Sequence, residues 1–488
     1  MRCKYFALLT LTVTSTLFSC TSGPYTPKRY FSLYTYRDYQ RHNFMNGGAA
    51  PTQGDSKILV IPIWFTDSAD YIRENKKEGV RTDIEKAFFG TTEETGWHSV
   101  SSYYKEDSFG HVNISGVCAP WYECERPSTD FYNADYMEEL LTSAVKWYKS
   151  YSGESKLTDF DADGDGFIDG VAYIYAAPDS SNLPGKNAGN LWGYTTWFTG
   201  TYPSRTNPSL KNIFWASYDF LYDYDTAIDR AGTPANRGDN YQATIDAHCY
   251  IHEWGHNFGL PDYYDYDYIN SFAGGFSMQD SNVGAHDPYS RYSLGWVDPY
   301  IPTQNCTIEL KKIEQSGECI LLAPEFTKSC FDEFVMIEYY SPEGLNELDT
   351  YHSYLGRYPS GLTEPGIRIW HIDSRLMKYN SRGYPQGITN DPTKSYVIPA
   401  TSNDTTYEYG IDNDYHTLTL IRNDPEATYE FAPEVISEEL FYEGDFFSLN
   451  AFQYQFKNND KLNNNKKFTW KVLIEELNEE YATIKLTK

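Results

Sequence analysis

The pattern of apolar and polar positions changes along the chain at about residue 302. Up to that point, segments rich in β-branched and aromatic residues predict strands, and apolar residues at helical spacing predict helices. The strands are expected at 57–65, 111–115 and 170–176, and the helices at 83–89, 99–107 and 136–148. Alternation of this kind is typical of an α/β or α+β unit.

Beyond residue 302, predicted strands follow one another and convincing helical patterns become scarce. These short strands are expected at 306–311, 334–340, 366–372, 417–421, 471–474 and 482–486. A β-rich C-terminal region follows, for which a sandwich is one arrangement. The Asn- and Lys-rich stretch 457–467 is expected to be an exposed hairpin loop.

The first nineteen residues have the features of a bacterial lipoprotein signal peptide. Arg2 and Lys4 precede an apolar stretch, 5–18, that is shorter than the ~20 residues of a membrane span. It ends in Ser19-Cys20, which resembles a lipobox, where the Cys is acylated and becomes the mature N-terminus. We therefore expect an exported protein, anchored at the cell surface or outer membrane. An ordinary signal peptide, with release into the medium, is the alternative.

Length and patterning divide the 488 residues into four parts. These are a signal peptide (1–19), a spacer (20–56), an α/β unit (57–302) and a β-rich region (303–488). The net charge of −28 repels nucleic acid and anionic lipid, so neither is expected as a partner, and membrane attachment would occur only through the lipid anchor. The cysteines after residue 20 are even in number and permit disulfides, with Cys118 and Cys124 the easiest local pair.

The strongest chemical signal is the pattern H-E-x-x-H-x-x-G-x-x-D, formed by His252, Glu253, His256, Gly259 and Asp262. On a helix, residues four apart share a face, so His252 and His256 present two imidazoles side by side, as zinc requires. Gly259 permits the chain to turn sharply, which can bring Asp262 back as a third ligand. A surface helix with two incidental histidines is the alternative, and an acid elsewhere in place of Asp262 also stays open.

Glu253 stands next to the first histidine and is the expected general base and acid. Zinc lowers the pKa of a bound water towards ~7. A neighbouring carboxylate can then take the proton of that water and pass it to the leaving amine. The pattern thus predicts hydrolysis of peptide bonds by a zinc metalloendopeptidase.

A second metal site is predicted in the acidic loop D-x-D-x-D-G-x-x-D. Asp161, Asp163, Asp165 and Asp169 supply side-chain ligands, and Phe167 supplies a backbone carbonyl, as in the first part of an EF-hand loop. So many like charges in so few residues repel each other unless a cation neutralises them, which favours calcium. A solvated acidic turn is the alternative.

The string HEWGHNFGLPDYYD resembles the active-site segment of immune inhibitor A-type metallopeptidases, secreted bacterial proteins of metzincin-like kind. Further segments resemble the same family: KILVIPIWFTDS, SVSSYYKEDSFGHVNISG, DFDADGDGFIDGVAYIYA, DPYSRYSLGWVDP and EPGIRIWHID. The resemblance covers about 56–375 and implies that 57–302 is a metzincin-like catalytic domain acting on extracellular proteins or peptides. We expect a monomer.

Metzincins place a Met beneath the zinc in a tight turn, and the resemblance assigns this position to Met278. Some members carry a Tyr two residues later, but here that residue is Asp280, so Tyr289 or Tyr292 is the candidate stabiliser of the oxyanion. A rival of another class keeps this fold without the chemistry. It is a calcium-stabilised surface binding lipoprotein whose β-rich region grips a host protein or glycan.

Overall fold

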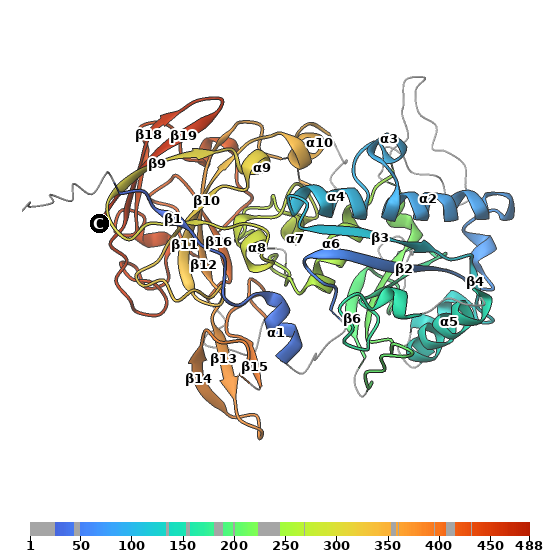
Figure 1. Cartoon of the computed structure of the whole chain (residues 1–488). Coiled ribbons are helices and arrows are strands. Elements are labelled where there is room, and N and C mark those ends of the chain that lie inside the picture. Colours follow the sequence, from blue (N-terminus) through green and yellow to red (C-terminus); the bar gives the residue numbers. More distant parts are fainter. Residues whose placement is uncertain are drawn as a thin grey trace, which may run out of the picture.

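Five main strands of the N-terminal half form a mixed sheet in the order β3-β2-β5-β7-β6, with the short β4 paired to one end of β2. β2, β3, β5 and β7 run parallel, whereas β6 runs antiparallel to β7 at one edge. The bounds are β2 Gly54–Trp64, β3 Val112–Cys118, β4 Tyr122–Glu123, β5 Val171–Tyr175, β6 Tyr194–Trp197 and β7 Asn212–Ser217. This sheet lies in the right-hand half of Figure 1.

The computed structural model describes residues 25–42, 49–132, 136–152, 157–179, 189–198, 201–222, 245–267, 269–352, 358–359, 361–394, 396–406, 415–430 and 432–488. The expected signal peptide and Cys20 lie outside these residues. Within them, no helix combines the length and the apolar character needed to cross a membrane.

The helices of the described residues are short or medium in length. The α-helices are α1 Tyr36–His42, α2 Lys77–Phe89, α3 Thr92–Thr95, α4 Val100–Asp107, α5 Met137–Tyr151, α6 His248–Phe258, α7 Met278–Ser281, α8 Pro288–Ser293, α9 Ile313–Ser316 and α10 Glu347–Tyr351. The 3-10 helices are η1 Ser68–Asp70, η2 Glu74–Lys76, η3 Ser128–Tyr132, η5 Leu157–Phe160, η7 Tyr218–Leu221, η8 Gly344–Asn346, η9 Ser437–Glu439 and η10 Gln453–Gln455.

The mixed sheet is buried on both faces, because successive side chains of a strand point to opposite sides. Ile58 and Val60 of β2 belong to the core that also holds residues of α2, α4 and α6. Leu59 and Ile61 belong to a separate core that includes the apolar face of α5. The continuous apolar run of β2 is therefore explained by helices on both sides, as in other parallel sheets.

Three further sheets follow in the C-terminal half, which lies at the left of Figure 1. One has the order β1-β8-β10-β11-β12-β16, another β17-β18-β19-β9, and a small one β14-β13-β15. Their bounds are β1 Lys28–Arg29, β8 Tyr300–Ile301, β9 Cys306–Lys311, β10 Cys319–Leu322, β11 Glu333–Tyr340, β12 Gly366–Asp373, β13 Leu376–Tyr379, β14 Pro385–Thr389, β15 Val397–Pro399, β16 Leu418–Ile421, β17 Phe446–Ser448, β18 Lys471–Leu477 and β19 Tyr481–Thr487.

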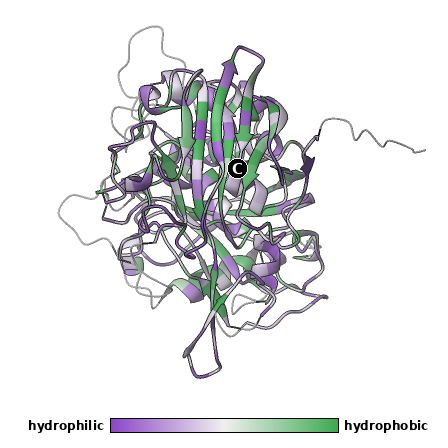
Figure 2. Cartoon of the chain, turned by 90° about the vertical axis from the view of Figure 1, so that its left-hand side faces the viewer, coloured by the Kyte–Doolittle hydropathy of each residue, from purple (hydrophilic) through white to green (hydrophobic). Residues whose placement is uncertain are grey.

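The sheet containing β11 and β12 is a middle layer of the molecule. Val335 and Ile337 of β11 pack in the core shared with β9, β18 and β19, so these two sheets form a sandwich. Phe334 and Met336, on the other face, pack in the same core as α6. The outer sheet alternates apolar and polar residues along its strands, as its exposed side requires; Figure 2 views the molecule from this side.

Part of the expected spacer is folded against the rest of the chain. β1 pairs antiparallel with β8, and α1 lies beside the middle layer. Tyr36 and Tyr39 of α1 are buried and contact Phe331, and Tyr36 also contacts Tyr289. The expected exposed loop at 457–467 is wrong in part, because Leu462 and Asn463 are buried there.

Candidate active site

Helix α6 carries the H-E-x-x-H pattern through the interior of the molecule. Only His256 among its eleven residues is more than marginally accessible. Gly259 ends the helix with φ 107°, a left-handed conformation that L side chains rarely adopt, and Leu260 N–H then donates to the carbonyl of Gly255. The sequence prediction of a sharp turn at Gly259 is confirmed, and the turn returns the chain toward the histidines.

The returning chain brings the carboxylate of Asp262 against both imidazoles. Asp262 Oδ1 lies 3.0 Å from His252 Nε2 and 3.2 Å from His256 Nε2. Two ligands of a tetrahedral zinc ion at bond lengths of ~2.0–2.2 Å stand roughly 3.3 Å apart. Both distances to the Asp262 oxygen are therefore close to this spacing, and all three ligand atoms lie within 4.8 Å of one another. We call these three residues the His–Asp cluster.

Each histidine of the cluster is oriented through its other ring nitrogen. His252 Nδ1 donates to the Met278 carbonyl at 2.8 Å, and His256 Nδ1 donates to the Leu260 carbonyl at 2.7 Å. A proton on Nδ1 leaves the Nε2 lone pair free for a metal, which is the usual arrangement of metal-binding histidines. Met278 is fully buried and begins α7, so the turn assigned to it lies directly against the cluster.

The charges within the cluster favour binding of a cation. Burial alone would raise the pKa of the Asp262 carboxyl, but His256 and His252 outweigh burial and hold that pKa well below its usual range. Burial likewise lowers the pKa of His256, yet Asp262 raises it to about 9. A carboxylate and an imidazole that attract a proton this strongly also attract a divalent ion, which competes with that proton.

Glu253 lies beside the cluster and is held by a residue from the sheet. The Thr195 hydroxyl of edge strand β6 lies 2.9 Å from the Glu253 carbonyl and 3.1 Å from Glu253 Oε2. Burial is the largest influence on this carboxyl and raises its pKa above the usual value. A raised pKa suits a group that must take up a proton and release it again.

Tyr266 joins the site from the segment after the turn. Its hydroxyl donates to Asp262 Oδ2 at 2.8 Å, while half of the side chain stays exposed (51%). Neither Tyr266 nor Thr195 was expected from the sequence. The spacing of four residues between Asp262 and Tyr266 was the one sequence signal for the contact between them. The contact of Thr195 with Glu253 depends on where β6 lies in the fold, which the sequence does not give.

Two cavities adjoin the cluster. The first, of about 480 Å³, is lined by His252 and Glu253, and we call it the Glu253 cavity. The second, of about 690 Å³, is lined by His256 and Asp262, and we call it the Asp262 cavity. Both also contain residues flanking or within β6, so the edge strand runs past the cluster from one cavity to the other.

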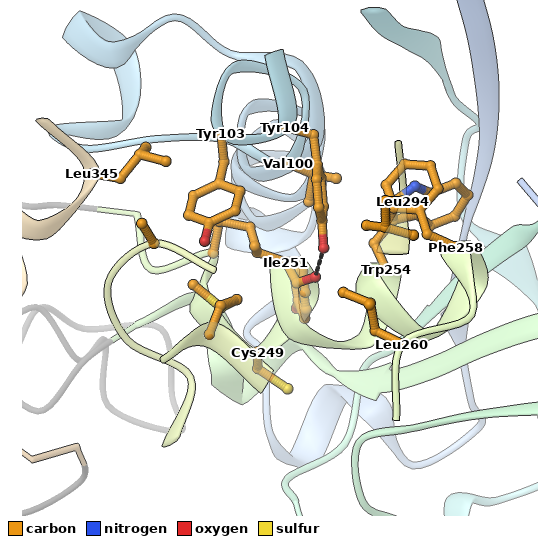
Figure 3. Packing of buried hydrophobic residues seen from close by; sticks show 14 of the residues in the cluster. Val100, Tyr103, Tyr104, Cys249, Ile251, Trp254, Phe258, Leu260, Leu294 and Leu345 are labelled. Carbon is orange, nitrogen blue, oxygen red and sulfur yellow. Dashed lines mark hydrogen bonds between the residues drawn. The ribbon is translucent and has the colours of Figure 1, made fainter. Parts of the chain in front are cut away.

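The interior side of α6 is fixed by aromatic packing. Figure 3 shows Tyr104 of α4 above the helix, where its hydroxyl donates to the Ile251 carbonyl at 2.6 Å. Tyr104 also contacts the ring of Phe258, which in turn packs against Trp254 and Trp296. Large buried rings of this kind restrict the helix to one position, which keeps its ligand face toward the cavities.

The prediction that Tyr289 or Tyr292 steadies an oxyanion is wrong. Both side chains are fully buried, and both rings pack against Phe334 of the middle layer. The Tyr289 hydroxyl lies 3.5 Å from that of Tyr36. Helix α8 turns these residues toward the core between the two halves, so their hydroxyls line neither cavity beside the cluster.

The acidic loop brings three of its four predicted carboxylates together. Oxygens of Asp161, Asp163 and Asp169 lie within 4.8 Å of one another. Asp165 is not among them, and its Oδ1 instead accepts from the Phe167 N–H at 2.9 Å. One oxygen of Asp161 and one of Asp169 are buried without a hydrogen-bond partner among the described residues. Burial raises the pKa of Asp169 to about 7.

A positive side chain already neutralises part of this loop. Arg37 of α1 forms an ion pair with Asp163, and Arg41 lies 3.1 Å from the same carboxylate. The sequence alone assigned this role to calcium, because nothing in it placed α1 beside the loop. The orphaned oxygens of Asp161 and Asp169 still fit a cation with oxygen ligands.

Cys118 and Cys124 are both free thiols, so the local disulfide expected between them is absent. His248, four residues before His252, lies away from the cluster. It is buried between Asp246 and Asp349 and stacks on Trp97 with ring centroids 4.0 Å apart. His371 pairs with Glu333 at 2.9 Å, which agrees with a structural role.

No family model matches the chain. It is similar to Immune inhibitor A from Bacillus thuringiensis subsp. alesti, with 24% identity over 190 residues. The similar stretch is 34% of this chain and 25% of that protein, so the chain spans about a quarter of this relative's length. The likeness agrees with the family resemblance in the sequence, and at this identity and coverage it indicates at most a distant relationship. The mixed α/β architecture is consistent with an α+β fold.

Proposed function

We propose that this protein is an exported zinc metalloendopeptidase that cleaves extracellular proteins or peptides. The observation that carries the proposal is the His–Asp cluster, whose ligand atoms stand 3.0 and 3.2 Å apart with each histidine oriented through Nδ1. The buried Glu253 beside the cluster and the distant likeness to Immune inhibitor A support the same function.

Each residue of the site has a distinct part in the proposed reaction. His252, His256 and Asp262 would hold the metal, and a zinc ion there would polarise the scissile carbonyl and acidify a water molecule. Glu253 takes a proton from the attacking water and delivers it to the leaving amine, so no covalent intermediate forms. The Thr195 hydroxyl keeps Glu253 in position, and the Tyr266 hydroxyl replaces Tyr289 and Tyr292 as the candidate group facing the oxyanion.

The most direct test measures metal and activity together on the same preparation. We expect about one zinc ion per chain by elemental mass spectrometry, cleavage of casein, and loss of both after treatment with a chelator. Adding zinc back should restore cleavage. Protein that contains no zinc and does not cleave casein would contradict the proposal.

Substitution Glu253→Gln separates the chemical step from metal binding. It removes the proton carrier and keeps the size of the side chain, so kcat/KM on a peptide substrate should fall about 10³-fold. Zinc content and melting temperature should stay at the wild-type level. Activity within tenfold of the wild type would exclude the role given to Glu253.

The acidic loop is proposed as a calcium site formed by Asp161, Asp163 and Asp169, with Asp165 outside the group. The orphaned oxygens of Asp161 and Asp169 support it.

The rival function, a surface binding lipoprotein without catalysis, has one favourable observation. A separate cavity of about 580 Å³ contains Phe272, His416 and Tyr429, whose rings stack in sequence. Absence of both zinc and proteolysis, combined with glycan or protein binding at this cavity, would favour the rival.

The location at the membrane is also a proposal, because Cys20 lies outside the described residues. Two acyl chains suffice for stable anchoring where one is marginal. We expect the wild type to fractionate with membranes and Cys20→Ala to be released or to accumulate as precursor. An unacylated N-terminus in the medium, found by intact-mass analysis, would identify an ordinary signal peptide instead.

A further inference from the structure

The Glu253 cavity has walls from elements that are far apart in the sequence. α6 contributes Cys249 as well as His252 and Glu253, and Gly193 lies just before β6. Asp280 comes from α7, which follows the turn at Met278, and Glu434 comes from the C-terminal half. A volume of about 480 Å³ next to the proposed general base gives room for a long side chain of a bound substrate.

The walls of this cavity are strongly acidic. Besides Glu253, they carry the carboxylates of Asp179, Asp265, Asp280 and Glu434, and the described lining residues include neither Lys nor Arg. These carboxylates surround the space and do not converge on one point, because no three of them form a metal-type group among the described residues. The arrangement therefore suits an elongated cation, such as a basic side chain, better than a metal ion.

Asp280 is the most informative of these acids. The residue is only 4% exposed, and its Oδ2 accepts a hydrogen bond from the Gly275 N–H at 2.7 Å. Burial, together with the neighbouring carboxylate of Glu434, raises the pKa of Asp280 to about 7. A positive charge placed in the cavity would favour the ionised form of this carboxylate and would be attracted by it.

The direction of edge strand β6 assigns the cavity to one side of the cleaved bond. Gly193 and Trp192 precede β6 and line the Glu253 cavity, whereas Trp197 at the end of β6 lines the Asp262 cavity. An extended peptide added antiparallel to β6, the more stable pairing, runs from Trp197 toward Gly193. Residues after the cleaved bond then enter the Glu253 cavity.

We propose that the Glu253 cavity selects Lys or Arg as the first residue after the cleaved bond. The proposal rests on the proposed peptidase function and adds its substrate class. The basic side chain donates to the Asp280 carboxylate, and its charge is balanced by Glu434, Asp179 and Asp265, which also line the cavity. An acidic residue at the same substrate position meets like charges and is rejected.

Two assays with the full chain test this preference. In the first, quenched fluorescent peptides differ only in the residue after the cleaved bond, which is Lys, Arg, Leu or Glu. We expect kcat/KM for Lys and Arg to exceed that for Glu by about 100-fold, with Leu between them. In the second, cleavage sites in unfolded casein are identified by mass spectrometry, and basic residues should be enriched directly after the cleaved bonds.

Charge variants connect the preference to the cavity. Glu434→Lys changes an exposed residue, so it should fold, and it should lower the ratio of kcat/KM for the Lys peptide to kcat/KM for the Leu peptide at least tenfold. Asp280→Asn keeps an acceptor for Gly275 N–H and should weaken the same preference. Glu438→Lys, an equally exposed acid four residues further along and outside the lining, is the matched control and should leave the preference intact.

The outcomes separate the two proposals. Failure to cleave both casein and every peptide would contradict the peptidase function itself. Cleavage of casein and of all peptides without a basic preference would overturn the cavity assignment alone. Enrichment of basic residues before the cleaved bond, or an equal effect of Glu434→Lys and Glu438→Lys, would also overturn it.

Discussion

At the scale of single residues, the side chains around the His–Asp cluster act mainly by fixing the geometry of others. His252 and His256 are each held through Nδ1 by a backbone carbonyl, and Asp262 is held through Oδ2 by Tyr266. Backbone partners cannot be removed by substitution, so Tyr266 is the supporting contact that mutation can test.

We predict that Tyr266→Phe weakens zinc binding about tenfold, since outer contacts of this kind typically contribute ten- to a hundredfold. Zinc affinity measured by competition with a chromophoric chelator checks this. A further fall of kcat at saturating zinc would indicate that the hydroxyl also contacts the reacting carbonyl. Tyr384→Phe, which changes an exposed tyrosine (63%), is the control and should alter neither quantity. Unchanged zinc affinity in Tyr266→Phe would contradict the supporting role.

That the residues of the His–Asp cluster lie together could be predicted from the sequence, because their spacing is local. Helical periodicity places His252 beside His256, and Gly259 is needed for the positive φ that returns Asp262. Thr195 and Asp280 come from other elements, and no local spacing connects them to Glu253. Tyr289 and Tyr292 were misassigned for the same reason, since the rotation of α8 depends on packing against Phe334.

At the scale of elements, the acidic loop connects η5 to β5, a central strand of the mixed sheet. We predict that calcium raises the melting temperature of protein first stripped of divalent ions. Binding only to the folded state adds about 2.7 kcal/mol when calcium is a hundredfold above its Kd. Asp161→Asn should reduce the shift, whereas Asp130→Asn, outside the loop, should preserve it. A melting temperature insensitive to calcium in the wild type would exclude the site.

At the start of helix α6, His248 contacts the carboxylates of Asp246 and Asp349, and these contacts should make the stability of the protein depend on pH. Burial lowers the pKa of His248, but Asp349 and Asp246 outweigh burial and raise it to about 10. The ordinary value of an unfolded histidine is ~6.5. The stabilisation from protonated His248 is thus fully present below pH ~6.5 and is lost as the pH rises toward 10.

We predict that His248→Gln is less stable than the wild type at pH 6, and that the difference narrows steadily up to pH 10. Urea unfolding at several pH values measures the free energy of unfolding of both proteins. The exposed His111→Gln is the control, for which we expect a small difference that does not vary with pH. A constant difference for His248→Gln would show that packing against Trp97, rather than charge, accounts for its effect.

Most of the longer strands and helices could be predicted from sequence, and their ends were the main error. α2 begins at Lys77, six residues before the expected helix, because its first turns contain few apolar residues. The short strands β6, β13 and β14 were missed, since partly exposed segments of four or five residues have no distinctive pattern. The alternation of β11 between two cores could not be anticipated, because both faces of the strand are apolar.

At the scale of the whole molecule, the N-terminal segment contributes to stability although its sequence suggested a spacer. We predict that Tyr36→Ala lowers the free energy of unfolding by about 3 kcal/mol, because it leaves a cavity against Phe331 and Tyr289. Phe31→Ala, five residues earlier and 69% exposed, is the matched control and should change it by less than about 0.5 kcal/mol. Equal effects would show that α1 is not packed as described.

The two cavities beside the cluster draw part of their walls from the C-terminal half. Tyr358, Pro359 and Glu434 line one, and Ile398 and Asp404 line the other, whereas the His–Asp cluster and Glu253 come from the N-terminal half. Under the proposed function, the residues that act on the bond thus lie in one stretch of the gene, whereas the cavity walls come from both that stretch and the later one. Substitution or recombination within the later stretch can then change part of the walls without changing the His–Asp cluster or Glu253. Related proteins with the same cluster would therefore differ first in the substrates that they accept.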